Sequence, residues 1–372
     1  MSQASPKPTR VFPCPGCGAS LTFDPTDGGL TCRYCGHREA IPPIAGEITE
    51  NPYEEYLRPR PEQLKQISEH ASDVTCSSCG AAITFIGEEL SDLCPFCGSA
   101  ITVQAIQSDP SVFPEALIAF RLSQAQATGF IGEWLKTRWF APNALKKFAS
   151  QETISGVYLP FWTYDAATVS DYTGERGEHY WETETYTETD SNGNRVERTR
   201  QVQKTRWYSA SGRVARDFDD VLVAATRSVE EKHLTKLAPW DLRALALYNP
   251  AYLAGFKSQR YQVGLADGFG VAKEIMANVI RGDVRSDIGG DEQRISSVQT
   301  NYSDITFKYI LLPVYVGAYR FNNKVYQVLV NALTGSVHGD RPYSVRKILL
   351  LVLSIIAVLV LAYLYIYTQG QH

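Results

Sequence analysis

The sequence predicts an α+β multidomain protein: two tandem cysteine-rich ribbons, an α+β body with an antiparallel sheet and a long hairpin, and one C-terminal transmembrane helix. Three observations predict this class. Eight cysteines fall in four regularly spaced pairs, β-prone segments alternate with amphipathic helical segments in the central region, and an uncharged apolar run lies near the C-terminus. Apolar residues make up 44% of the 372 residues, so the chain can bury a core.

Charge and the N-terminus exclude two classes of protein. Lys and Arg total 36 against 40 for Asp and Glu, a net charge of -4, which argues against a chain built to coat nucleic acid. Residues 1–10 contain no apolar stretch of the kind that a secretory signal needs, so we expect no signal peptide. Because this stretch is polar, we expect a disordered N-terminus.

The cysteines form two copies of one pattern, in which two CxxC pairs, each followed by Gly, are separated by 14 residues. This spacing is close to that of zinc ribbons, where two knuckles converge on one ion with Zn–S distances of about 2.3 Å. We therefore predict a zinc ribbon at residues 11–41, a second at residues 73–104, and one Zn²⁺ in each. The eight predicted ligands are Cys14, Cys17, Cys32, Cys35, Cys76, Cys79, Cys94 and Cys97.

Other chemistry is open to eight cysteines. Disulfides suit a secreted protein better than a cytoplasmic one, and four thiolates can also hold iron. A catalytic zinc is disfavoured because four protein ligands leave no position for water or substrate. His37 lies two residues after Cys35 and could replace it as a ligand, although a surface position is the simpler interpretation.

The segment between the ribbons, residues 42–72, is rich in proline. It is typical of a semi-rigid spacer. Pro61 and Glu62 suit the start of a short helix that would run to about His70. We expect the ribbons to project from the body on this spacer.

The body is predicted to span residues 112–343, with two helices. Ser123 and Gln126 form a capping box that begins a helix from Ser123 to Arg138. A second apolar pattern of helical period predicts a helix from about Ser258 to Arg281.

Two β-prone segments of the body resemble each other. The run from Val157 to Tyr164 is echoed by the run from Ile310 to Tyr319, with Pro160 matching Pro313. This similarity indicates a second internal duplication. Because proline cannot donate a ladder hydrogen bond, we expect an edge or a bulge at both positions.

A long polar hairpin is predicted around the turn at residues 191–194, which contains Asn-Gly. Its first strand is acidic, net -5 from Glu175 to Asp190, and its second is basic, net +6 from Arg195 to Arg216. The basic strand could be a nucleic-acid patch. We favour charge complementarity between the two strands, because the acidic strand cancels much of that field.

The last segments lead into a membrane. A strand, a turn and a strand at residues 324–339 precede the run Ile348–Tyr367, 20 residues without a charge, which is long enough to span a bilayer as a helix. Arg341, Arg346 and Lys347 precede this run, and the positive-inside rule then places the N-terminal domains in the cytoplasm. The prediction is a single-pass, tail-anchored protein of the inner (cytoplasmic) membrane with a short C-terminus outside.

Signatures of enzymes are missing from the sequence. It contains no GxxxxGK[ST] phosphate loop and no HExxH, and its six histidines are scattered singly. We therefore predict no catalytic residues and no enzymatic activity.

The paired ribbons, the block Gly156–Asp165, the block Leu311–Tyr315 and the turn Val330–Gly335 resemble a bacterial family of membrane-anchored, TFIIB-type zinc-ribbon proteins. Its members are often labelled primosomal protein N′ (replication factor Y), superfamily II helicase, although the ATPase motifs are missing here. The resemblance implies a place in a membrane-stress system with PspA-like and SPFH-like partners, in which such proteins recruit soluble partners to the membrane.

The expected function is that of a membrane-tethered adaptor or scaffold. The bilayer would hold the chain through Ile348–Tyr367, and the ribbons would bind protein partners through faces that include Tyr34 and Phe96. The alternative is a zinc-ribbon protein that binds nucleic acid at the membrane. It is disfavoured because residues 75–102 contain three acids and no Lys or Arg.

Overall fold

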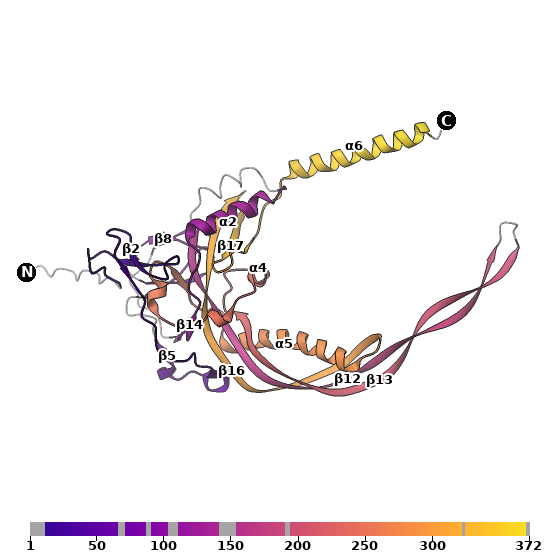
Figure 1. The fold of residues 1–372 in the computed structure, drawn as a ribbon, viewed down its shortest axis with the longest axis horizontal. Coiled ribbons are helices and arrows are strands. Elements are labelled where there is room, and N and C mark those ends of the chain that lie inside the picture. Colours follow the sequence, from indigo (N-terminus) through magenta and orange to yellow (C-terminus); the bar gives the residue numbers. More distant parts are fainter. Residues whose placement is uncertain are drawn as a thin grey trace, which may run out of the picture.

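The computed structural model describes residues 12–65, 71–86, 91–102, 111–140, 154–189, 194–321 and 324–369. A body built on one large sheet carries two extensions, a two-stranded arm and the C-terminal helix α6, which leave it toward the same side of the view (Figure 1). The predicted α+β class, with an antiparallel sheet, is confirmed.

The sheet is organised around two long antiparallel strands, β12 (Ser155–Thr189) and β16 (Glu292–Phe321). On its other edge β12 pairs with β13 (Arg195–Ala224), and this pair continues beyond the body as the arm. The smaller strands of the sheet are β4 (Asn51–Pro52), β6 (Ala71–Thr75), β7 (Ala82–Ile86), β11 (Ala116–Leu117), β14 (Ala246–Leu247), β15 (Lys257–Gln259), β17 (Lys324–Asn331) and β18 (Val337–Gly339).

Four described helices lie around this sheet, and a fifth, α6 (Val345–Gln369), extends away from it (Figure 1). The four are α1 (Tyr53–Tyr56), α2 (Gln124–Lys136), α4 (Glu231–Leu237) and α5 (Leu265–Ile288), with 3₁₀ turns η1 (Pro61–Gln63), η2 (Leu242–Ala244) and η3 (Pro250–Leu253). Outside the large sheet, β5 (Leu64–Lys65) pairs with β10 (Ser111–Val112).

Apolar residues of β12 pack on both faces of the sheet. Tyr158, Trp162 and Tyr164 belong to one buried cluster. The intervening Val157, Leu159 and Phe161 belong to the other. Because side chains alternate along a strand, a strand that is covered on both faces reads as the continuous apolar run seen in the sequence.

Both predicted body helices are present, one with shifted bounds. The Ser123 capping box is formed, since the Gln126 amide donates to Ser123 Oγ at 3.3 Å and the Ser123 amide donates to Gln126 Oε1 at 2.8 Å. The second helix, α5, does not begin at Ser258. Residues 257–259 pair with β12 as strand β15, so the helix begins only at Leu265.

The expected edge or bulge at the two prolines is wrong, because both lie inside the sheet. Pro160 faces Leu311 of β16. On the opposite edge of β12, the neighbouring strand changes at Pro160. There β15 pairs with β12 as far as Tyr158, and β13 begins to pair at Phe161. Because neither β15 nor β13 pairs with β12 at position 160, the N–H that proline lacks is not needed for a strand hydrogen bond. The Pro160 carbonyl accepts a hydrogen bond from the Ala225 amide.

The second proline lies at an equivalent switch. On β16 the parallel neighbour β11 pairs as far as Leu311, and β17 begins to pair at Val314, immediately after Pro313. Leu159 and Leu312 face each other, so the two proline segments are related by a local pseudo-twofold axis. Each parallel neighbour also begins eight residues before a helix, β11 before α2 and β15 before α5. This arrangement agrees with the predicted second duplication.

The proline-rich segment is not a free spacer. Its strand β4 pairs with Thr306 and Phe307 of β16, and the ring of Tyr53 packs 4.7 Å from that of Phe269 on α5. The predicted helix to His70 is also wrong as far as it is described, because η1 ends at Gln63 and Leu64–Lys65 form a strand. Residues 66–70 lie outside the described chain.

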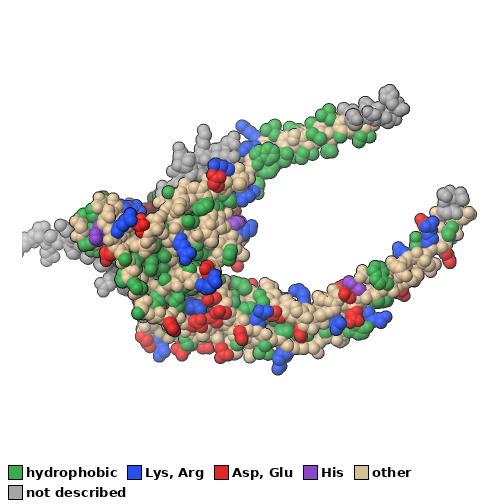
Figure 2. All heavy atoms as spheres, in the orientation of Figure 1, with side chains coloured by type: hydrophobic (Ala, Val, Ile, Leu, Met, Phe, Trp, Pro, Cys, Tyr) green, Lys and Arg blue, Asp and Glu red, His purple; other side chains and the backbone are tan. Residues whose placement is uncertain are grey.

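The C-terminal segment matches its prediction in outline. Strands β17 and β18 form a hairpin around Gly335, whose φ of 75° suits glycine. Helix α6 follows, and the window Val345–Tyr363 is long and apolar enough to cross a membrane. None of that window is buried against the body, and its apolar side chains form the upper extension in Figure 2.

Candidate metal centres

The first cysteine ribbon is a three-stranded sheet of β1 (Leu21–Asp24), β2 (Gly29–Cys32) and β3 (Arg38–Glu39). Its two knuckles place all four sulfurs within 4.8 Å of one another. Cys14 Sγ lies 3.4 Å from Cys35 Sγ, and Cys17 Sγ lies 3.5 Å from Cys32 Sγ. These are the four residues predicted to hold one ion.

The second ribbon has the same constellation. Strands β6 and β7 carry one knuckle, and the pair β8 (Ser91–Leu93) and β9 (Ala100–Thr102) carries the other. Cys76 Sγ lies 3.6 Å from Cys97 Sγ, and Cys79 Sγ lies 3.7 Å from Cys94 Sγ. All eight cysteines are free of disulfides.

The four knuckles share one backbone design. In each, the amide of the glycine after the second cysteine donates to the carbonyl of the first cysteine, at 2.8–3.0 Å. These glycines have φ between 70° and 75°, a region that residues with a Cβ rarely adopt. The glycine in each CxxCG motif is therefore required by the turn itself.

The distances suit tetrahedral coordination. Four ligands at about 2.3 Å from one ion would be separated by about 3.8 Å, close to the sulfur separations in both ribbons. Hydrogen bonds from the amides of Cys35 and Tyr34 lower the pKa of Cys32 to about 6, whereas burial raises the pKa of Cys79 to about 11. Because a cysteine binds a metal ion as the thiolate, metal binding would release the remaining thiol protons. Each cluster could thus hold one metal ion, with no coordination position left for a substrate.

The second ribbon is docked on the body, which corrects the prediction that both ribbons project from it. Strand β7 pairs with β15 and so joins the large sheet. Lys257 Nζ lies 2.6 Å from Asp92 Oδ2, and Arg260 Nη1 lies 2.9 Å from Asp73 Oδ2.

Phe96 belongs to this docked surface. Its side chain is 1% exposed within the second buried cluster, and the side-chain amide of Gln327 donates to its carbonyl at 2.8 Å. The prediction that Phe96 lies on an exposed face is therefore wrong. An apolar residue between two knuckle cysteines can serve a contact within the same chain as well as one with another protein.

The first ribbon docks through a different side and leaves one knuckle free. The Phe23 amide donates to the carbonyl of Ala254, and the Phe23 ring packs edge-on against Tyr252 at 5.3 Å. Tyr34, on the knuckle that faces away, is 84% exposed, as predicted. Beside this ribbon, a pocket of about 300 Å³ is lined by residues that include Arg33 and Gln124.

The arm confirms the predicted hairpin, and its charges are arranged in cross-strand pairs. Arg198 lies 3.1 Å from Glu188, and Lys204 lies 2.7 Å from Glu182. The register runs from Phe161↔Ala224 to Thr189↔Arg195, with the turn at residues 190–193 outside the described chain. These pairs support charge complementarity over a nucleic-acid patch.

Sequence reasoning missed two polar clusters. Lys308, only 7% exposed, lies 2.9 Å from Glu50, 2.8 Å from Asp220 and 3.6 Å from Asp165. His233, buried on α4, lies 3.2 Å from Asp340, just before α6. The residues of each cluster are far apart in the chain, so no spacing in the sequence could have identified them.

Comparison with known proteins finds a similarity to one uncharacterized bacterial protein. The chain is 24% identical over 339 residues to the uncharacterized protein YdjG of Bacillus subtilis (strain 168), a match that covers 91% of each chain. No protein-family model matches the chain, and no solved structure does. The similarity thus covers most of both chains without identifying a function.

Proposed function

We propose that this protein is a membrane-tethered zinc-ribbon adaptor that recruits a protein partner to the cytoplasmic face of the membrane, in a PspA/SPFH-like membrane-stress system. In this proposal α6 crosses the bilayer, and each four-cysteine cluster holds a structural Zn²⁺. The observation that carries the proposal is the combination, in one chain, of two four-cysteine clusters that could each hold a metal ion with an exposed apolar helix.

In this proposal the partner docks on the first ribbon. The second ribbon's Phe96 knuckle is buried against the body, whereas the knuckle of Tyr34 is exposed beside a pocket. The benefit of the tether is effective concentration, because a weak contact becomes nearly intramolecular once both partners are at the membrane. Charge weighs against the nucleic-acid alternative, since Arg38, one of two basic residues on the first ribbon, is paired with Asp27 at 2.6 Å.

The test is recovery of bound proteins from detergent-solubilised membranes with the wild-type chain and three single variants. Tyr34→Ala should lower recovery of the specific prey at least about fivefold. Tyr208→Ala, which removes an exposed tyrosine of β13, should leave it unchanged. Recovery equal to that of the wild-type chain with both Tyr34→Ala and the ribbon variant Cys35→Ser would refute the docking surface. Salt-sensitive capture of DNA or RNA instead of protein would favour the alternative.

A further inference from the structure

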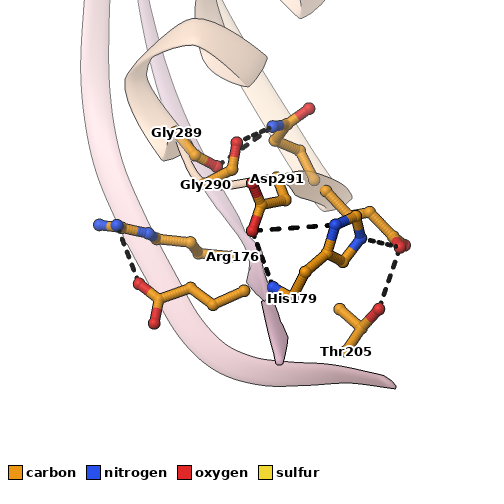
Figure 3. A network of polar contacts seen from close by, with 9 residues as sticks. Arg176, His179, Thr205, Gly289, Gly290 and Asp291 are labelled. Carbon is orange, nitrogen blue, oxygen red and sulfur yellow. Dashed lines mark hydrogen bonds and ion pairs between the residues drawn. The ribbon is translucent and has the colours of Figure 1, made fainter. Parts of the chain in front are cut away.

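The arm begins at the first residue of β16, Glu292, beyond which β12 and β13 continue as a two-stranded ribbon, and a polar network marks that point (Figure 3). After α5, Gly289 and Gly290 turn the chain at positive φ, and β16 starts at Glu292 opposite Gly177 of β12. The Asp291 carboxylate then accepts a hydrogen bond from the His179 amide at 2.7 Å. Glu292 accepts hydrogen bonds from His179 Nε2 at 2.9 Å and from Thr205 Oγ1 at 3.0 Å.

This network fixes the direction of the backbone groups along the arm. The Gly177 carbonyl and the His179 amide both point away from β13, toward residue 291. Because N–H and C=O directions alternate along a strand, Trp181, Thr183, Thr185, Thr187 and Thr189 also direct theirs outward. No described strand pairs with this edge beyond Gly177, and β13 has no described strand on its own outer edge.

The two open edges carry opposite charge. Residues 178–189 of β12 contain four acids and no Lys or Arg, whereas residues 195–206 of β13 contain five bases and one acid, a net +4. The charged partners share one face of the arm, as the pairs of Glu184 with Arg200 and Glu188 with Arg198 show. The opposite face is mainly Thr and Gln and also carries the exposed Trp181. On this face, Thr183 Oγ1 accepts a hydrogen bond from the side-chain amide of Gln201.

A second arm in the same orientation would fit this edge in both hydrogen bonding and charge. Its β13 would lie antiparallel to β12 of the first copy, with outward residues opposite outward residues. The charged residues would then face each other on the same side, acid against base. A twofold arrangement would place β12 beside β12, or β13 beside β13, and oppose like charges.

We propose that the outer part of the arm, residues 178–189 and 195–206, is a surface on which copies of this chain assemble, with the acidic β12 edge of one arm pairing with the basic β13 edge of the next. The common orientation rests on the membrane tether of the proposed function, since α6 would insert every copy the same way. The contact is heterologous, so it repeats from copy to copy.

The width of the body limits the size of this assembly. Each arm adds two strands, about 10 Å, to a shared sheet. The body is visibly wider than the arm in Figure 1, so neighbouring bodies must fan outward. A row of such copies curves, and it forms a ring of three or more chains where the rotation between copies closes and an open row where it does not.

The first experiment measures the mass of the full-length chain in detergent by light scattering, with crosslinking in native membranes alongside. Wild type should give assemblies of at least three copies. Thr185→Pro removes an outward N–H but no bond to β13, and it should weaken association at least about tenfold. Thr185→Val changes the same side chain, keeps the N–H and should assemble like wild type.

A mixing experiment tests the role of charge. One variant reverses the acidic edge (Glu182→Lys, Glu184→Lys and Glu188→Lys), and another reverses the basic edge (Arg198→Glu, Arg200→Glu and Lys204→Glu). Each should be monomeric alone, and an equimolar mixture should assemble. A monomeric wild type, a twofold dimer or a Thr185→Pro variant that assembles normally would overturn the proposal. A chain that assembles but captures no prey would contradict the adaptor function alone.

Discussion

Replacing Phe96 tests whether the second ribbon is part of the body. Its side chain is 1% exposed in a cluster with Leu159, Leu234 and Leu329, so Phe96→Ala removes a fully buried ring. Such truncations cost about 3–5 kcal/mol. With an unfolding entropy of about 2.1 cal/mol/K per residue over the 322 described residues, this corresponds to a fall in melting temperature of about 4–7 °C.

The assay is thermal unfolding of zinc-loaded protein in detergent, followed by tryptophan fluorescence. Tyr34→Ala, on the matching knuckle of the first ribbon, is the control. It should change the melting temperature by less than about 1 °C, because surface substitutions are usually within about 0.5 kcal/mol. Equally small shifts for both variants would refute the docked position of the second ribbon.

Three further predictions concern charge and metal. Lys308→Met leaves the surrounding carboxylates without their buried cation and should cost about 3–5 kcal/mol in urea unfolding; no loss would show that the cluster is solvated. The hydrogen bond from Arg216 lowers the pKa of Asp283, a contribution that is present above the unfolded pKa of about 3.9 and is lost as pH falls through the folded value. Between about pH 5 and about pH 3, the melting temperature of wild type should therefore fall more than that of Arg216→Gln; parallel curves would contradict this. A chelator should release metal in two phases, the faster from the first ribbon with its exposed Cys17 and Cys35, and Cys35→Ser should retain only the slower phase; one common rate would refute the difference in protection.

Local sequence signals predicted local structure well. The cysteine spacing identified both clusters, the Ser123 capping box located the start of α2, and Asn-Gly with alternating residues located the arm. Each of these signals lies within a few dozen residues. Their physical cause, a turn, a cap or a ligand knuckle, acts over the same short distance.

Predictions that depended on distant partners failed. Ser258 has helical surroundings in the sequence, yet it pairs with β12 and with β7, so tertiary pairing overrides the pattern. A proline in a strand indicates a sheet edge because it has no N–H to donate to a neighbouring strand. At Pro160 no neighbour needs that donor, because the strand beside β12 changes there, inside the sheet. Burial of Phe96 depends on β17, more than 200 residues later, whose position the sequence does not encode in any local pattern.

The metal content of the purified full-length chain tests the central claim most directly. Elemental analysis of protein prepared under reducing conditions should find two zinc ions per chain, falling to one when Cys14 and Cys17 are both replaced by serine. A wild-type chain without stoichiometric metal, or one that contains iron in place of zinc, would contradict the account of two closed zinc clusters.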